Sequence, residues 1–133
     1  MSFIEFKHIG KKYAGADKNS VSDFNLEINE KEFIAFVGPS GCGKSTTLRM
    51  VAGFEEITEG DLYIDGKKVN ETAPRDRGIA MVFQNYALYP HMTVEKNIGY
   101  GLKNMKMPAD QIKKKVDWAI DILGLQELSL IHI

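Results

Sequence analysis

A glycine-rich turn at residues 38–45, GPSGCGKS, restricts the possible folds of this chain more than any other segment. Its outer glycines stand five positions apart, and a lysine and a serine follow the second one. Residues 33–37, FIAFV, form an apolar run of strand length directly before the turn. Residues 46–52 then place apolar side chains at helical spacing, and Gly53 is positioned to end a helix. The pattern predicts a buried strand, a glycine turn and a helix, in that order.

This order of residues predicts a binding site for anions. Glycines adopt backbone conformations closed to other residues, which lets successive N–H groups turn toward phosphate oxygens. The start of the helix adds unpaired N–H groups and the positive end of the helix dipole. Lys44 is placed to reach terminal phosphates, Ser45 to offer its hydroxyl to Mg²⁺, and Thr46 to donate a hydrogen bond to the phosphates. The alternative is a glycine-rich turn that binds nothing, and the flanking strand and helix patterns favour phosphate.

Composition narrows the class of protein. With 44% hydrophobic and 26% charged residues, the 133-residue chain is long enough for one globular domain with a core. A net charge of -1 gives no broad basic field for nucleic acid. The apolar runs are too short to span a bilayer and the first residues lack a signal pattern, so we expect a cytoplasmic protein. The single cysteine, Cys42, fits a reducing compartment and is interpreted as a small loop residue rather than a catalytic thiol.

Three further segments predict an antiparallel layer beside the nucleotide-binding sheet. Residues 3–9 and 22–28 mix apolar and polar side chains in the manner of half-buried strands, the second with Phe24, Leu26 and Ile28 on one face and Ser22 in phase with them. Residues 60–65 read as another strand, and the Asp65-Gly66 pair after it is a strong hairpin signal.

Residues 79–83, IAMVF, form the second fully apolar strand-like run, and Gln84 stands at its end. In open α/β sheets ligands bind outside the carboxyl ends of the strands, which is where the glycine turn also leaves its strand. Gln84 is therefore a candidate contact for Mg²⁺ or a water near the phosphates. The alternative is an ordinary amide that caps a strand. In the preceding loop, Arg75 and Arg77 are interpreted as solvated charges.

The last third of the chain predicts an exposed loop and two helices. Residues 85–92 carry several aromatic side chains, which suggests a protein contact, with core filling as the alternative. Thr93 is placed to cap a helix beginning at Val94. Pro108 fits the first turn of another helix, which Gly124 ends. Its apolar face comprises Ile112, Val116, Ala119, Ile120 and Leu123, and Lys113, Lys114 and Lys115 form its solvated side.

Taken together, these segments resemble the ATP-binding subunits of ABC transporters, especially importer ATPases of the maltose and multiple-sugar type. The resemblance depends on the phrases FVGPSGCGKSTTLRMVAGFEEITEGDLYIDGKKVN and RDRGIAMVFQNYALYPHMTVEKNIGYGLK, and it covers residues 1 to 125. It implies an α/β fold with a P-loop NTPase core sheet and an antiparallel β layer. It also implies a dimer of ATP-binding subunits, peripheral on the inner face of the membrane, that drives transmembrane permease subunits by hydrolysing ATP with Mg²⁺.

The resemblance also assigns roles to individual residues. Tyr13 matches the aromatic residue that stacks on adenine, and Gln84 matches the glutamine that links Mg²⁺ and the attacking water to the permease contact. The catalytic candidates are thus Lys44 and Gln84, and the metal candidates are Ser45 and Gln84. The ATP-binding set is completed by the phosphate loop: Gly38, Pro39, Ser40, Gly41, Cys42, Gly43, Lys44, Ser45 and Thr46. The implied permease contact comprises Tyr86, Ala87, Leu88, Tyr89, Pro90 and His91.

The chain departs from the family pattern at its C-terminal end. An ATP hydrolase of this class needs a later apolar strand that ends in Asp-Glu, and the sequence contains none. The Leu-Ser-Gly-Gly-Gln phrase and the later switch histidine are also absent, and His132 is not interpreted as that histidine. We therefore expect a partial nucleotide-binding domain at residues 1–127, incomplete at its C-terminal end, with a doubtful, non-native tail at 128–133. Residues 33–37 and 79–83 should then be less covered than apolar strands require.

Three functions are consistent with these patterns. The first is the ATP-binding part of an importer ATPase for a carbohydrate or, alternatively, for another solute; the chain by itself would be inactive. The second is a nucleotide-binding module without turnover. The third is a soluble P-loop enzyme such as a small-molecule kinase, against which Gln84 and the loop after it argue.

Overall fold

The structure is a computed structural model that describes residues 2–128 and residue 130. The chain divides into two compact units, Met1–Met81 and Val82–Ile133, each with its own internal packing. The predicted tail at 128–133, including His132, lies largely outside the described residues.

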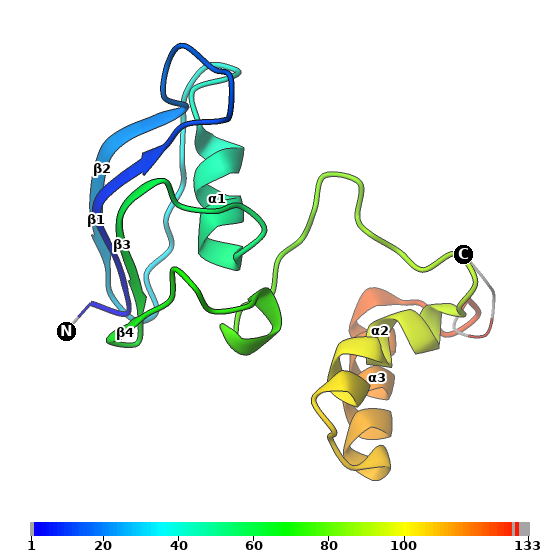
Figure 1. Cartoon of the computed structure of the whole chain (residues 1–133). Coiled ribbons are helices and arrows are strands. Elements are labelled where there is room, and N and C mark those ends of the chain that lie inside the picture. Colours follow the sequence, from blue (N-terminus) through cyan, green and yellow to red (C-terminus); the bar gives the residue numbers. More distant parts are fainter. Residues whose placement is uncertain (1, 129, 131–133) are drawn as a thin grey trace. The chain divides into compact units, whose positions relative to one another are not determined.

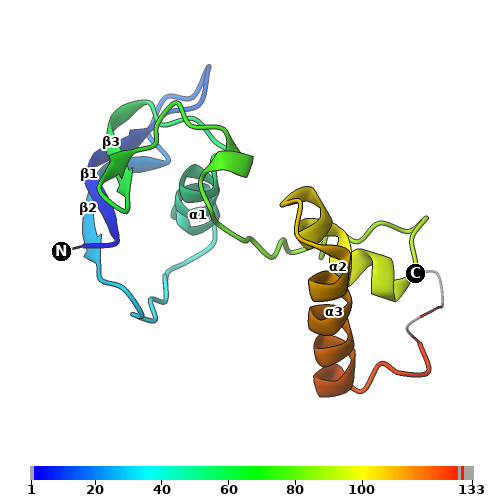
Figure 2. The ribbon, with the colours of Figure 1, turned by 90° about the horizontal axis from the view of Figure 1, so that it is seen from below.

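The first unit is built on an antiparallel sheet with one helix against it (Figure 1). The strands are β1 (Ile4–Lys11), β2 (Val21–Ile28), β3 (Glu59–Ile64) and β4 (Lys67–Lys68), in the order β2-β1-β3-β4. Helix α1 (Lys44–Ala52) lies beside the sheet in both views (Figures 1 and 2). The core between them consists of Phe6, Ile9, Val21, Met50, Leu62, Ile64 and Val69. The predicted antiparallel layer is thus confirmed.

The predicted hairpin turn is confirmed in its backbone geometry. Asp65 and Gly66 have φ angles of 49° and 71°, the left-handed conformation that a tight turn between twisted strands requires. On either side of this turn, Tyr63 pairs with Lys68 and Ile64 pairs with Lys67.

The alternation predicted for residues 22–28 is correct from Phe24 onward and wrong at its start. Phe24, Leu26 and Ile28 are partly buried, as expected, but Ser22 is exposed and Val21 is buried instead. The register of β1 against β2 shifts between Ile9 and Lys11, and Asp23 has a φ of 45°. A bulge of this kind inserts one residue and moves the preceding side chains to the opposite face.

The two apolar runs predicted as buried parallel strands are not strands in the structure. Residues 33–37 and 79–83 have no regular secondary structure, and Phe33, Val37 and Val82 are 93%, 92% and 84% exposed. A strand exists only through hydrogen bonds to a neighbouring strand, and within the described residues the strands of the sheet pair only with one another. The expectation that these runs are incompletely covered is confirmed.

Arg77 is not the solvated charge that the sequence suggested. Arg77 is only 8% exposed. Its guanidinium group donates to the carbonyl oxygens of Met50, Val51, Asn70 and Thr72 at 2.7–3.4 Å. Arg77 follows the short 3₁₀ turn η1 (Pro74–Asp76) and adds a side-chain donor to carbonyl groups in the last turn of α1. Arg75, in contrast, is exposed as predicted.

The second unit consists of an irregular segment followed by α2 (Val94–Asn104) and α3 (Ala109–Leu123). Thr93 caps α2 as predicted, since its hydroxyl accepts a hydrogen bond from the Lys96 N–H at 3.2 Å. Gly124 ends α3 in the left-handed conformation, also as predicted. Val116 and Ile120 are buried on the predicted face of α3, whereas Leu123 is 63% exposed. Within the described residues, neither helix is both long and apolar enough to cross a membrane.

Candidate phosphate-binding turn and its surroundings

The glycine turn leads directly into α1, as the sequence predicted. Gly41 and Gly43 have φ angles of 80° and 94°, which side chains strongly disfavour. A Cβ atom at Gly43 would stand 2.6 Å from the carbonyl oxygen of Ser20, so only glycine fits there. Gly43 is also the N-cap of α1, and no described side chain caps this helix end. The first N–H groups of α1 are therefore oriented for an anion rather than for a capping side chain.

Lys44 lies folded over the turn. Its ammonium group donates to the carbonyl oxygens of Gly38 at 2.6 Å and Pro39 at 2.8 Å, and it lies 3.4 Å from the Cys42 sulfur. These partners are neutral, whereas an ionised phosphate adds the attraction between opposite charges to the same kind of hydrogen bond. The side chain can therefore exchange its carbonyl partners for phosphate oxygens.

Ser45 opens the first turn of α1 and is exposed, whereas Thr46 is partly buried. An exposed hydroxyl next to Lys44 is the kind of ligand that Mg²⁺ takes together with phosphate oxygens and water. The residues present thus fit a Mg²⁺-bound nucleotide.

Tyr13 lies beside the turn although it is 33 positions from Thr46. Its hydroxyl is 3.4 Å from the Thr46 hydroxyl and donates to Glu55 at 3.2 Å. The ring is 39% exposed, and the ammonium group of Lys11 lies 5.0 Å from its centre. The structure therefore brings together the predicted base-stacking residue and the predicted phosphate loop.

Sequence reasoning missed Lys11 and Glu55. Lys11 forms an ion pair with Glu55 at 2.9 Å, and their side chains are 8% and 20% exposed. The hydrogen bond from Lys11 lowers the pKa of Glu55, and that from Tyr13 lowers it further, against an opposing effect of burial. Nothing in the local sequence distinguishes Glu55 from its neighbour Glu56. The only available signal was the position of Lys11, at the end of a strand and two residues before Tyr13.

Gln84 belongs to the second unit, not to the unit that contains the glycine turn. It is exposed and starts a turn in which Tyr86 and Ala87 have φ angles of 60° and 50°. Its predicted role beside Mg²⁺ stays a prediction. Positive φ angles at two successive non-glycine residues are uncommon and occur where function constrains the backbone.

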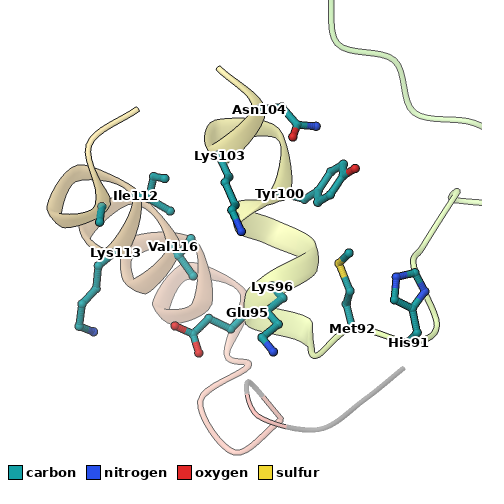
Figure 3. Close-up of a pocket in the computed structure, with 12 residues that line it drawn as sticks. His91, Met92, Glu95, Lys96, Tyr100, Lys103, Asn104, Ile112, Lys113 and Val116 are labelled. Atoms are coloured by element: carbon teal, nitrogen blue, oxygen red, sulfur yellow. The ribbon is translucent and has the colours of Figure 1, made fainter. Parts of the chain in front are cut away.

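The predicted permease contact, residues 86–91, adjoins a groove on the second unit through His91 (Figure 3). Tyr86 is 74% and Leu88 52% exposed, whereas Tyr89 packs against Tyr100 of α2 at a ring distance of 4.5 Å. The groove has a volume of about 750 Å³ and lies between α2, α3 and the segment before α2. It is lined by His91, Met92, Glu95, Lys96, Gly99, Tyr100, Lys103, Asn104, Ala109, Ile112, Lys113 and Val116. Of the six predicted contact residues, only His91 lines it.

Asn97 holds the loop beside this groove. Its side-chain oxygen accepts from the Tyr89 N–H at 2.8 Å, and its amide nitrogen donates to the carbonyl oxygens of Tyr89, Met92 and Thr93 at 3.0–3.3 Å. The sequence offered no sign of this role, because the pattern of α2 marks Asn97 only as a polar residue.

Known proteins are similar to this chain in sequence. The oligosaccharides import ATP-binding protein MsmX of Bacillus subtilis (strain 168) is 65% identical over 96% of this chain and 34% of its own length. The multiple sugar-binding transport ATP-binding protein MsmK of Streptococcus mutans is 60% identical over 93% of this chain and 33% of its own length. The chain thus spans about a third of the length of these relatives.

Solved structures show the same fold. The ATP-binding cassette MJ0796, in a dimeric post-hydrolysis state bound to ADP and Pi, matches 97% of this chain and 60% of its own, with a TM-score of 0.81 and 30% identity. A second dimeric structure of this bacterial ABC transporter cassette gives a TM-score of 0.82. The predicted P-loop NTPase fold with an antiparallel layer is confirmed. The ABC transporter family profile matches residues 21–132, and the chain therefore belongs to the ABC transporter family.

Proposed function

We propose that this chain is the nucleotide-binding part of an importer subunit that couples ATP hydrolysis to the transport of a carbohydrate. The observation that supports this most directly is the position of Tyr13 against the turn that holds Lys44. ATP has an aromatic end, its purine ring, and an anionic end, its triphosphate. These two ends match the ring of Tyr13 and the ammonium group of Lys44. The sugar substrate is proposed because the two relatives are named for oligosaccharide import and for multiple sugar-binding transport.

In this proposal each part of the nucleotide has its own contacts. The ring of Tyr13 stacks on adenine, and the backbone N–H groups of residues 38–46, apart from Pro39, surround the phosphates. Lys44 neutralises the terminal phosphates; a unit charge at ~4 Å is worth about 4 kcal/mol at an effective dielectric constant of ~20. Ser45 would offer its hydroxyl to Mg²⁺, and Gln84 is the second candidate ligand; the ion would supply positive charge to the phosphates.

The partners are a second ATP-binding subunit and a pair of membrane-spanning permease subunits, so that the protein works at the inner face of the cell membrane. The related cassette structures are dimers, which supports the first partner. The exposed segment 86–91 and the adjoining groove, with its apolar wall of Ile112 and Val116, suit a short permease helix.

The alternative function is nucleotide binding without turnover, and it applies to this chain taken alone. The 133 residues contain no apolar strand that ends in Asp-Glu, so no carboxylate of that kind is present to polarise the attacking water. We propose that the chain binds ATP but hydrolyses it no faster than background.

Calorimetric titration with Mg-ATP tests the proposal. In the complete protein encoded by the gene, Lys44→Ala should weaken ATP binding by at least about a hundredfold, because the phosphates lose their cationic partner. Lys67→Ala, on the exposed strand β4, removes the same charge far from the turn in sequence and should leave binding unchanged. Unchanged affinity in Lys44→Ala would contradict the proposed function.

Replacing Gln84 separates binding from turnover. Gln84→Ala should leave Mg-ATP affinity within about twofold and slow the ATPase reaction that accompanies transport by about ten- to a hundredfold. Transport assays with the associated permease, using sugars and non-sugar solutes in parallel, then identify the solute class. A loss of ATP affinity equal to that of Lys44→Ala would contradict the role proposed for Gln84.

A further inference from the structure

The surroundings of Tyr13 contain an ion pair to which the phosphate-loop pattern gives no role. One carboxylate, that of Glu55, contacts both of its neighbours: Oε1 lies 2.9 Å from the Lys11 ammonium, and Oε2 accepts from the Tyr13 hydroxyl at 3.2 Å. The Lys11 ammonium also lies 5.0 Å from the centre of the Tyr13 ring. The three side chains therefore form a closed set in which each touches the other two.

The pair is much less exposed than the ring it holds. The side chains of Lys11 and Glu55 are 8% and 20% exposed, whereas Tyr13 is 39% exposed. Lys11 ends strand β1, and Glu55 follows the C-terminal end of α1, so two regular elements anchor the pair. Breaking a buried pair by removing one partner is strongly unfavourable because the other charge stays buried. The ion pair of Lys11 and Glu55 therefore holds the partly exposed ring of Tyr13 in place.

The hydrogen bonds also determine the direction of the Tyr13 hydroxyl. The hydroxyl group of tyrosine has a single hydrogen, and Tyr13 donates it to Glu55. The phenol oxygen also lies 3.4 Å from the Thr46 hydroxyl, whose single hydrogen can go either to this oxygen or to a phosphate. The Tyr13 hydroxyl thus stands between the Glu55 carboxylate and the phosphate loop.

We propose that Glu55, held by Lys11, is a positioning residue that fixes the ring of Tyr13 for the base of the nucleotide. This inference rests on the proposed function, because it takes ATP as the ligand. A purely structural ion pair would affect both ends of the nucleotide equally. A positioning residue that acts through Tyr13 affects the base and leaves the phosphates alone.

The test compares two ligands in the complete protein. Calorimetry gives the dissociation constants of Mg-ATP and of Mg-tripolyphosphate, which has the anionic end but no base. Glu55→Ala should weaken ATP binding about tenfold, within the range of a lost base-stacking contact. Tripolyphosphate binding should stay within about twofold of the wild type. The ratio of the two constants is the readout that a merely structural role does not change.

Three controls support the comparison. Glu56→Ala removes the neighbouring, exposed carboxylate and should leave both constants unchanged. Glu55→Gln keeps an oxygen acceptor for the Tyr13 hydroxyl and should retain most of the ATP affinity. In a Tyr13→Ala background, Glu55→Ala should cause no further change in the ratio, since the residue through which it acts is gone.

An unchanged ratio in Glu55→Ala, or an equal weakening of both ligands, would overturn the inference. If Glu55→Ala does not fold, the double variant Lys11→Met, Glu55→Leu removes the pair without leaving a buried charge, and its ratio must still shift. Failure of the proposed function looks different, because Lys44→Ala would then bind both ligands as the wild type does.

Discussion

Arg77 joins the end of α1 to the chain that follows β4, through hydrogen bonds to the carbonyl oxygens of Met50, Val51, Asn70 and Thr72. Arg77→Met keeps most of the side-chain volume and removes the guanidinium hydrogen bonds to these carbonyls, of which that of Met50 keeps the Gly53 N–H as a further donor. We expect the free energy of unfolding of the complete protein to fall by about 2–4 kcal/mol, since charged hydrogen bonds contribute ~1.5–3 kcal/mol each but share one side chain here. Denaturant titration measures the change.

The matched control for this prediction is the neighbouring arginine. Arg75→Met removes the same charge at an exposed position and should change stability by less than about 0.5 kcal/mol. Equal losses in the two variants would mean that the carbonyl contacts of Arg77 contribute nothing.

Glu55 gives a prediction about pH. Hydrogen bonds, first from Lys11 and then from Tyr13, lower the pKa of its carboxyl group, so the folded state favours the ionised form. The stability it contributes is therefore fully present above the ordinary carboxyl pKa of ~4.3 and is lost as pH falls through the lower folded-state value. The stability difference between wild type and Glu55→Gln in the complete protein should be constant near neutral pH and shrink below about pH 4.3.

Urea unfolding at a series of pH values measures this difference. Glu56→Gln, in which an exposed carboxylate is replaced, is the control and should change stability near neutral pH by less than about 0.5 kcal/mol. A difference for Glu55→Gln that grows on acidification would show that the carboxylate is not stabilised by its neighbours.

At the level of elements, Asn97 connects helix α2 to the loop before it. Asn97→Ala removes its hydrogen bonds to the carbonyls of Tyr89, Met92 and Thr93 and to the Tyr89 N–H, while alanine preserves the helix. We expect faster hydrogen exchange of the amides at residues 89–92, because their local opening no longer breaks these bonds. Exchange measured by mass spectrometry on the complete protein tests this.

Lys114→Ala, an exposed substitution on α3, is the control and should leave exchange at residues 89–92 unchanged. If Asn97→Ala also leaves it unchanged, other contacts hold the loop. In transport assays, we expect Asn97→Ala to lower coupled ATPase activity more than ATP affinity, since the altered loop belongs to the proposed permease contact.

At the level of the whole chain, the exposed apolar segments predict that these 133 residues, taken alone, are poorly soluble and loosely packed. Phe33 and Val37 before the turn, and Val82 in the second apolar run, are more than four-fifths exposed. Exposed strand-forming segments without sheet partners favour association between chains. We expect low solubility, dye binding typical of a loosely packed core, and a broad thermal transition.

Calorimetry and light scattering at dilute concentration measure this property. A sharp, cooperative melt of a monomer would contradict the prediction. The natural control is the complete protein, which should melt cooperatively if further strands cover the same residues.

Local sequence determined those parts of the protein whose conformation depends on neighbours along the chain. The glycine turn, the helix after it, the Asp65-Gly66 hairpin, the Thr93 cap and the stop at Gly124 were all predicted, because backbone freedom and capping operate over a few residues. The sequence also gathers the phosphate-binding candidates into this one turn, and their role in binding stays a prediction.

Tertiary structure decided what depends on contacts between distant segments. It placed Tyr13 against Thr46 and Glu55, and it converted Arg77 from an apparent surface charge into a buried donor. It also shifted the face of β2 through a bulge and left residues 33–37 outside the sheet. Pairing and burial are properties of two segments together, and neither is encoded in the pattern of one segment alone.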